Sequence, residues 1–273
     1  MIINDKEFDT ENRAYIMGIL NFTPDSFSDG GKYNNIQLAL KHVQEMIEGG
    51  ADFIDVGGES TRPGYVMISE QEEIERIVPV IEQIKKNFDI PVSADTYKSQ
   101  VAKSAIMAGA DMINDIWGLR YDEKMAEVIA KNKVSCCLMH NRNLSENPYQ
   151  KDIMSELMMD LKKSIDIALS AGISKERIMI DPGIGFAKSL EENLKVMNHL
   201  EMLKELGFPI LLGTSRKSMI GLSLNLPSDE RLEGTIATTV IGMMKGCSFF
   251  RVHDVKENKR AVLMTRAIIS QVL

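Results

Sequence analysis

Polar or ionisable residues stand at the ends of most strand-like segments in this 273-residue chain. A single such residue is usually a turn former or a helix cap, but a set brought to one edge of a sheet would line a single pocket. Asp95 and Asp181 supply carboxylates and Asn114 supplies a carboxamide. These groups suit a planar heterocycle that has adjacent N–H donors and carbonyl acceptors. The strand-end residues are Asn21, Glu59, Asp95, Asn114, His140, Asp181, Ser215 and His253.

Cationic side chains follow several of the same segments, at or near the starts of helical patterns, where backbone N–H groups favour anions. We therefore expect the ligand to carry an anionic group as well as a heterocycle. The spacing shows no obvious Cys–His or Ser–His–Asp arrangement, so it does not favour covalent catalysis. The cationic residues are Arg62, Arg216, Lys217, Arg251 and His253.

The elements that must position these residues alternate regularly along the chain. Short apolar segments are separated by amphipathic ones such as 35–50, 69–88 and 191–207, whose apolar residues recur every three or four positions. Eight strand–helix units of roughly 34 residues predict an α/β fold, a (β/α)8 TIM barrel that occupies residues 1–273 as one domain. Active sites of this fold lie at the C-terminal ends of the strands. The predicted strands are 15–21, 53–59, 91–96, 112–116, 134–140, 178–183, 210–215 and 249–254.

Composition argues against several other classes of protein. The net charge is −7 and no basic stripe is present, so binding to nucleic acid is not expected. No apolar run reaches the ~18 residues of a membrane span, and the N-terminus lacks the pattern of a signal peptide. The three cysteines, with Cys136 and Cys137 adjacent, form no disulfide framework. These features are typical of a cytoplasmic protein.

Six separated motifs resemble those of the dihydropteroate synthases, a family of pterin-binding TIM barrels. The motifs are ILNFTPDSFSDGG (19–31), DVGGESTRPG (55–64), INDI (113–116), DPGIGFAKS (181–189), LLGTSRKS (211–218) and RVHDV (251–255). The resemblance implies a transferase of folate biosynthesis. Such an enzyme joins 6-hydroxymethyl-7,8-dihydropterin diphosphate to para-aminobenzoate, gives 7,8-dihydropteroate and releases pyrophosphate. It further implies Mg²⁺ as cofactor, a homodimer, and sensitivity to sulfonamides, which mimic para-aminobenzoate.

The resemblance also implies a role for individual residues, each of which is an expectation at this point. Asp29 would stabilise positive charge on the pterin methylene if the diphosphate departs before the amine attacks, and Asn21 would be the Mg²⁺ ligand. The catalytic residues would be Lys217, Asp29, Arg251 and His253. The pterin would contact Asp95, Asn114, Asp181, Lys217, Ile116, Met139, Gly185 and Phe186. The diphosphate would contact Asn21, Thr61, Arg62, Arg251 and His253, and para-aminobenzoate would contact Phe27, Pro63, Arg216 and Ser218.

Three alternatives stay open at this stage. Met139 is as well explained by core packing as by contact with the pterin. A pterin-dependent corrinoid methyltransferase would share the two aspartates and the asparagine, but it would need no diphosphate site. A catalytically silent homologue would bind the pterin without turnover, although it should have lost some of the motif residues, and all of them are present here.

Overall fold

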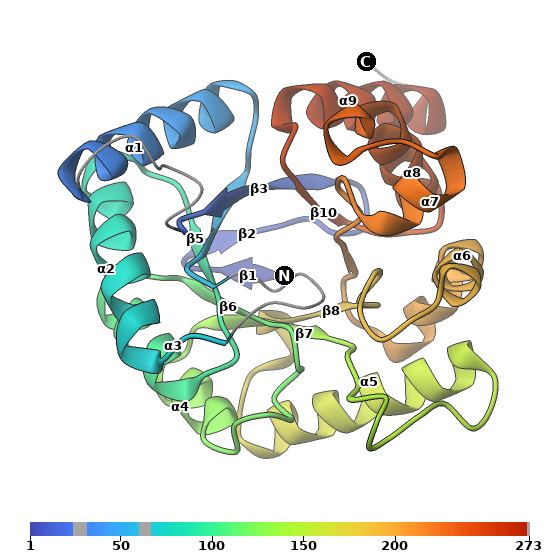
Figure 1. Cartoon of the computed structure of the whole chain (residues 1–273), viewed down its shortest axis with the longest axis horizontal. Coiled ribbons are helices and arrows are strands. Elements are labelled where there is room, and N and C mark those ends of the chain that lie inside the picture. The colour runs from blue at the N-terminus through green and yellow to red at the C-terminus, as the bar shows by residue number, and fades with distance from the viewer. Residues whose placement is uncertain (24–31, 60–66, 272–273) are drawn as a thin grey trace.

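A computed structural model describes residues 1–23, 32–59 and 67–271 of the chain. Within these ranges, eight parallel strands form one sheet in the order β8-β7-β6-β5-β4-β3-β10-β9, and a bridge between Ile180 and Ile210 joins its two edges (Figure 1). The predicted (β/α)8 TIM barrel is confirmed. Its strands are β3 (Tyr15–Asn21), β4 (Phe53–Gly57), β5 (Val92–Asp95), β6 (Met112–Asp115), β7 (Ser135–Met139), β8 (Ile178–Asp181), β9 (Leu211–Leu212) and β10 (Phe249–Val252).

Helices surround the strands in Figure 1 and cover the outer face of the barrel. Side-chain caps start three of them. Ser69 Oγ accepts the Glu72 N–H before α2, the Asp152 carboxylate accepts the Met154 and Ser155 N–H groups before α5, and Ser189 forms a capping box with Glu192 before α6. The helices are α1 (Lys32–Glu48), α2 (Glu70–Asn87), α3 (Ser99–Met107), α4 (Met125–Asn132), α5 (Ile153–Ser170), α6 (Leu190–Asn198), α7 (Ser218–Leu224), α8 (Leu232–Met244) and α9 (Val255–Ser270). Short 3₁₀ turns lie at η2 (Lys175–Arg177), η3 (Leu200–Leu206) and η4 (Ser228–Glu230).

The helical segment predicted at 191–207 is divided in two. The chain leaves the helical conformation at His199, whose φ is −124°, so α6 ends at Asn198 and η3 follows it. This break in the helix was not visible in the apolar periodicity, which continues across His199. In the part of the chain that the structure describes, no helix is both long and apolar enough to span a bilayer.

A short N-terminal hairpin, which the sequence did not predict, closes one end of the barrel. Strands β1 (Ile2–Ile3) and β2 (Lys6–Glu7) pair in antiparallel fashion around Asn4, whose φ of 55° suits a tight turn. Ile3 and Phe8 pack onto a buried layer inside the barrel at the N-terminal ends of the strands. This layer comprises Met17, Phe53, Met112, Cys137, Met179, Leu211 and Phe249. Because the N-terminal end is plugged by apolar side chains, the polar site must open at the other end.

Candidate active site

Inward-facing residues at the C-terminal ends of the strands form the site. Successive side chains of a strand alternate between its two faces, so the residue two places after each member of the buried layer also points into the barrel. This rule leads from Phe53 to Asp55, from Met112 to Asn114, from Met179 to Asp181 and from Phe249 to Arg251. The polar layer of the site therefore lies directly above an apolar layer of the barrel.

Asp55, Asp95, Asn114 and Arg251 form one hydrogen-bonded cluster from four different strands. The Arg251 guanidinium donates from Nε to Asp55 Oδ2 at 2.6 Å and from Nη2 to Asp95 Oδ2 at 2.7 Å. Asn114 Nδ2 donates to the same Asp55 oxygen at 3.2 Å. The sequence analysis overlooked Asp55, which is fully buried in the middle of β4. A carboxylate inside an otherwise apolar strand was the signal that could have identified it.

The electrostatics of this cluster leave two carboxylate oxygens available. Burial raises the pKa of Asp95 to about 7; the charge of Arg251 opposes that shift and the charge of Asp55 adds to it. Burial also opposes the charge of Arg251, but Asp55 and Asp95 outweigh it and raise the pKa of the guanidinium. Asp55 Oδ1 and Asp95 Oδ1 are buried without a hydrogen-bond partner among the described residues. Buried polar atoms of this kind are suited to accept N–H groups of a ligand.

Asp181 and Lys217 face the same space on the opposite wall. Asp181 Oδ1 accepts the Gly183 N–H at 2.6 Å. A Cβ atom placed on Gly213 would lie 3.8 Å from Asp181 Oδ2 and 3.9 Å from Lys217 Nζ, so the missing side chain leaves that space open. Burial raises the pKa of Asp181, and burial lowers the pKa of Lys217 to about 8 against the opposing charge of Asp181.

The loop after β8 holds the Lys217 side chain in place. Lys217 Nζ donates to the Ile184 carbonyl and lies 4.7 Å from the centre of the Phe186 ring. Gly185, between these residues, has a φ of +83°, and a Cβ atom on it would lie 3.1 Å from Lys217 Cδ. A glycine is therefore required where the loop passes over the lysine.

Apolar side chains form a separate wall of the site. Tyr97, Ile116 and Met139 pack together apart from the main core, and Trp117 and Phe186 pack against them. The Met139 side chain thus lies outside the core between strands and helices, and its contact with a pterin stays a prediction. Tyr97 was not singled out by the sequence analysis.

The residues that follow β9 lie next to those that follow β10 and form hydrogen bonds and an ion pair with them. His253 Nδ1 lies 3.0 Å from Ser215 Oγ, and the Arg216 guanidinium forms a two-pronged contact with the Asp254 carboxylate, with Nε to Oδ2 at 2.9 Å. Arg216 has a φ of +56°, and Ser218 is the first residue of α7. Arg216 is thus held by Asp254 close to the helix start that presents Ser218.

Two of the strand-end residues do not line the pocket. Glu59 is buried against Lys98 and Tyr97. His140, to which the sequence analysis assigns no role in the site, lies 2.9 Å from Lys188 Nζ through Nδ1 and 3.5 Å from Asp160 Oδ2 through Nε2. Burial, with the charge of Lys188, lowers the pKa of His140 to about 3, so the ring is neutral. The expectation that all eight residues converge on one pocket is wrong for Glu59, because β4 ends at Gly57 and the alternation of faces ends with it.

The residues present would fit a magnesium ion that is held mainly by the phosphates of a bound substrate. Within the described ranges, no group of three or more His, Cys, Asp or Glu side chains could hold a metal. A Cβ atom on Gly57 would lie 3.7 Å from both Asn21 Oδ1 and Asp95 Oδ2, so oxygen donors border the open space there. Mg²⁺ prefers oxygen ligands and commonly binds through one or two protein groups plus substrate phosphates and water. Asn21 suits that role.

Five of the expected site residues lie outside the described residues. They are Phe27 and Asp29 in the first motif, and Thr61, Arg62 and Pro63 in the second. Their roles remain expectations from the motifs.

Comparison with known proteins identifies the class to which this barrel belongs. The family described as "Pterin binding enzyme" matches residues 17–253, from within β3 to the residue after β10. A dihydropteroate synthase of Clostridium beijerinckii is 64% identical over 270 residues, which cover 98% of this chain and 99% of the relative. The corresponding enzyme of Bacillus subtilis is 52% identical over 261 residues, 96% of this chain and 90% of the relative. The chain belongs to the dihydropteroate synthases within the family of pterin-binding enzymes.

Solved structures agree with this assignment. A dihydropteroate synthase from Clostridium difficile, determined in the presence of pteroic acid, has a TM-score of 0.93 and 53% identity, with 96% of this chain and 99% of that chain covered. A Yersinia pestis enzyme in complex with a sulfonamide drug has a TM-score of 0.92 and 42% identity, with 99% of both chains covered. A Xanthomonas albilineans enzyme with 4-aminobenzoic acid has a TM-score of 0.90 and 40% identity, with 95% and 94% covered.

Proposed function

We propose that this chain condenses 6-hydroxymethyl-7,8-dihydropterin diphosphate with para-aminobenzoate and releases 7,8-dihydropteroate and pyrophosphate. The observation that carries the proposal is the polar layer of the barrel, in which Asp95, Asn114, Asp181 and Lys217 face one space at the open end. Membership of the dihydropteroate synthases supports it, as do relatives determined with pteroic acid and with 4-aminobenzoic acid. The reaction is one step of folate biosynthesis.

The polar layer supplies complementary groups for a pterin ring. The unpartnered oxygen of Asp95 and the carboxylate of Asp181 would accept ring N–H groups. The Lys217 ammonium would donate to a ring acceptor, and Asn114 would accept and donate through its carboxamide. Ile116, Met139 and Phe186 would form the apolar wall, while Gly185 lets the backbone pass close to the ring.

Cationic groups on one side of the pterin would hold the diphosphate. Arg251 and His253 stand on and after β10, and Asn21, Thr61 and Arg62 would complete this part of the site. When bound, Mg²⁺ would neutralise charge on the diphosphate and so favour its departure. The protein contributes fixed positive charge where negative charge develops, which is electrostatic stabilisation of the leaving group.

The bond between the pterin methylene carbon and the diphosphate oxygen would break first, with both electrons leaving on the diphosphate. The Asp29 carboxylate would stabilise the cationic methylene. The amine of para-aminobenzoate, placed by Phe27, Pro63, Arg216 and Ser218, would then form the C–N bond, and its extra proton would pass to solvent. Protein nucleophiles are not needed, and burial raises the pKa of the Cys137 thiol inside the barrel far above its ordinary value.

A turnover assay tests this function. The protein is incubated with the pterin diphosphate, para-aminobenzoate and Mg²⁺, and both dihydropteroate and pyrophosphate are followed. Equal release of the two products, lost in Lys217→Ala, supports the proposal. Binding of the pterin diphosphate without product would refute it and favour a silent homologue, while methyl transfer to a corrinoid would favour the methyltransferase. The chain's relatives and its cations at Arg216, Lys217, Arg251 and His253 favour neither alternative.

We also propose that the chain works as a homodimer in the cytoplasm, with residues 1–273 as one domain. Helices α8 and α9 lie side by side (Figure 1) and expose several large apolar side chains. Surface of this kind is typical of protein interfaces. Light scattering on the purified protein tests the dimer, which would be contradicted by a monomeric mass. The exposed residues are Ile241, Met244, Leu263, Met264, Ile268 and Ile269.

A further inference from the structure

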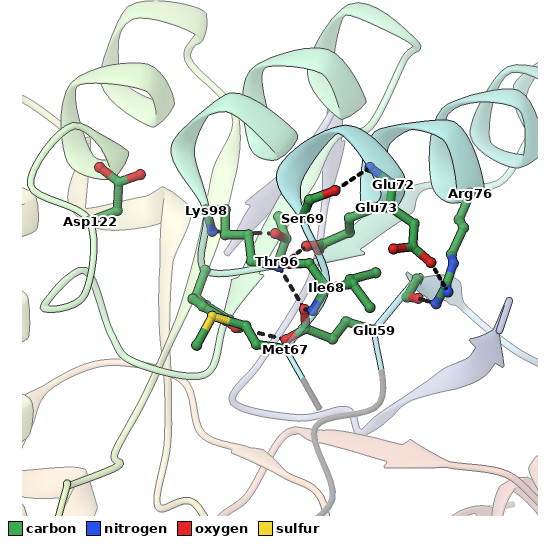
Figure 2. Close-up of polar contacts among 12 residues, drawn as sticks. Glu59, Met67, Ile68, Ser69, Glu72, Glu73, Arg76, Thr96, Lys98 and Asp122 are labelled. Atoms are coloured by element: carbon green, nitrogen blue, oxygen red, sulfur yellow. Dashed lines mark hydrogen bonds and ion pairs between the residues drawn. The ribbon is translucent and has the colours of Figure 1, made fainter. Parts of the chain in front are cut away.

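A buried ion cluster lies beside the candidate active site and joins the residues that follow β4, helix α2 and the turn between β5 and α3. Lys98 Nζ donates to Glu59 Oε2 at 2.6 Å, to Glu73 Oε2 at 2.7 Å and to the Ile68 carbonyl at 2.9 Å (Figure 2). All three hydrogens of the ammonium group therefore have an acceptor. Lys98, Glu59 and Glu73 are 5%, 6% and 1% exposed, so these contacts are shielded from solvent.

The cluster ties together two points that are close in space but separated by the segment 60–66. Glu59 Oε2 also accepts the Ile68 backbone N–H at 3.0 Å. Both backbone groups of Ile68 are thus bound, one by Glu59 and the other by Lys98. On the other side, Arg76 of α2 donates from Nη1 to the Gly58 carbonyl at 2.7 Å. The chain is consequently anchored immediately before and shortly after this segment.

The same cluster reaches the apolar wall of the site. The Tyr97 hydroxyl donates to Glu59 Oε1 at 2.7 Å, and its ring packs edge-on against Tyr121 with 4.7 Å between ring centres. Tyr97 is one of the residues that form the wall with Ile116 and Met139. One carboxylate, that of Glu59, therefore connects the anchored chain to the wall of the candidate pterin site.

Burial and pairing act in opposite directions on the charges of the cluster. Burial raises the pKa of Glu73, with Lys98 opposing that rise. Burial also opposes the charge of Lys98, but its hydrogen bonds to Glu59 and Glu73 outweigh this effect and raise its pKa. Removing one partner of such a cluster leaves a buried charge unpaired, whereas apolar residues of similar volume would be about as stable. Stability alone does not explain why ions occupy this position.

We propose that Lys98 is a positioning residue for the side of the active site where the diphosphate and para-aminobenzoate would bind. By tying Glu59 to Ile68, it fixes the points between which the chain carries Thr61, Arg62 and Pro63. The inference rests on the proposed function for the roles of these three residues. It differs from a general structural role because it predicts weaker binding of the diphosphate and of para-aminobenzoate, with little effect on binding of the pterin ring.

The decisive comparison is between wild type and a variant with the same formal buried charge. With all groups ionised, Glu59, Glu73 and Lys98 give −1 in wild type, and Glu59 alone gives −1 in Lys98→Met/Glu73→Gln. The single variant Glu73→Gln, with a formal charge of 0, controls for the loss of Glu73 because it retains both ties to Ile68. Lys85→Met is the matched control for the loss of a paired lysine, since Lys85 of α2 pairs with the Asp111 carboxylate at 2.8 Å, away from this cluster.

Two readouts are measured for each protein. Hydrogen exchange of the Ile68 amide tests the tie itself without any substrate. Steady-state kinetics give the KM for para-aminobenzoate. Calorimetry gives the dissociation constants of a sulfonamide, of the pterin diphosphate and of 6-hydroxymethyl-7,8-dihydropterin, which lacks the diphosphate. For the double variant relative to wild type, we expect exchange of the Ile68 amide to be at least about tenfold faster. The KM and the dissociation constants of the sulfonamide and of the pterin diphosphate should rise about tenfold, the loss expected for a charged hydrogen bond. The dissociation constant of the pterin without its diphosphate should change less than about threefold.

Unchanged exchange at Ile68, or equal weakening of the sulfonamide and of the pterin without its diphosphate, would overturn the inference. If wild type bound the pterin but formed no product, the proposed function would fall, while exchange at Ile68 and sulfonamide binding would still decide the role of Lys98. Should the double variant not fold, Glu59→Gln weakens the same ties without changing side-chain shape and is measured in the same way.

Discussion

Replacing Asp55 by asparagine tests whether the cluster inside the barrel prepares the pterin site. Asp55 keeps Arg251 from pairing with Asp95 alone, because the guanidinium divides its two donors between the carboxylates at 2.6 and 2.7 Å. With Asp55→Asn the shape is retained but the charge is lost. Arg251 should then bind Asp95 more strongly, and the pterin must compete with it for the same carboxylate.

The size of the effect follows from the type of bond that is lost. A hydrogen bond to a charged group contributes about 1.5–3 kcal/mol. Since about 1.4 kcal/mol corresponds to a factor of ten in affinity, we expect the dissociation constant of the pterin diphosphate to rise about 10- to 100-fold. Calorimetry gives this dissociation constant, and the titration is done well above pH 7, where Asp95 is ionised.

The matched control is Asp52→Asn. Asp52 immediately precedes the same strand and pairs with Lys259 at 2.8 Å and with the Ile16 N–H at 2.7 Å, at the opposite end of the barrel. This variant should lose stability without losing pterin affinity. A folded Asp55→Asn protein whose pterin affinity is within about twofold of wild type would refute the reasoning, since a charged hydrogen bond would then contribute nothing.

Three further predictions concern the metal, pH and the second substrate. Chelation of Mg²⁺ should abolish turnover, and Asn21→Ala should raise the Mg²⁺ concentration needed by about 10- to 100-fold in a metal titration. His140 has a pKa of about 3 in the folded protein against an ordinary 6.5, so the unfolded state binds more protons between these values. The free energy of unfolding should therefore fall as pH falls through this window, by up to about 1.4 kcal/mol per pH unit. Urea titrations should show a smaller fall in His140→Gln but not in a variant of the exposed His42. Arg216→Met should raise the KM for para-aminobenzoate about tenfold, because a charged hydrogen-bonding group is lost. Asp254→Asn, which releases the Arg216 guanidinium, should raise this KM by a smaller factor. Equal KM values in wild type and both variants would contradict this role of Arg216.

The barrel could be predicted from sequence because its signals are local. Strand β3 occupies the predicted residues 15–21, and each of the other strands lies within its predicted segment. The shortest is β9, where only Leu211–Leu212 pair out of the predicted 210–215. After Leu212 the chain leaves the sheet, and its side chains make other contacts: Thr214 hydrogen-bonds to Thr238, and Ser215 to His253.

The polar layer was partly predictable by the same alternation of faces. Asp95, Asn114 and Asp181 were recognised because they lie at or next to the ends of their strands, whereas Asp55 was passed over because it lies in the middle of one. Met139 points into the barrel, and its neighbour His140 consequently points away, so the alternation itself places His140 outside the pocket. Position within a strand, taken together with alternation, was the better signal.

The cluster around Lys98 could not be predicted from local patterns. Its members come from positions 59, 68, 73 and 98, and their contacts depend on how β4, α2 and the β5–α3 turn meet. The sequence marked Glu59 as a pocket residue, but its partner is a lysine 39 residues away. Pairings at that separation are fixed by the fold and leave no periodic trace.

The central claim is that the polar layer of this barrel binds a pterin diphosphate and joins it to an aminobenzoate. The most direct test is single-turnover analysis with wild type and Lys217→Met, following dihydropteroate and pyrophosphate together. We expect wild type to release the two products in equal amounts, and Lys217→Met to bind the pterin more weakly and form little product. Pterin diphosphate that binds equally well to both proteins, or that remains unconverted on wild type with para-aminobenzoate and Mg²⁺ present, would contradict the account.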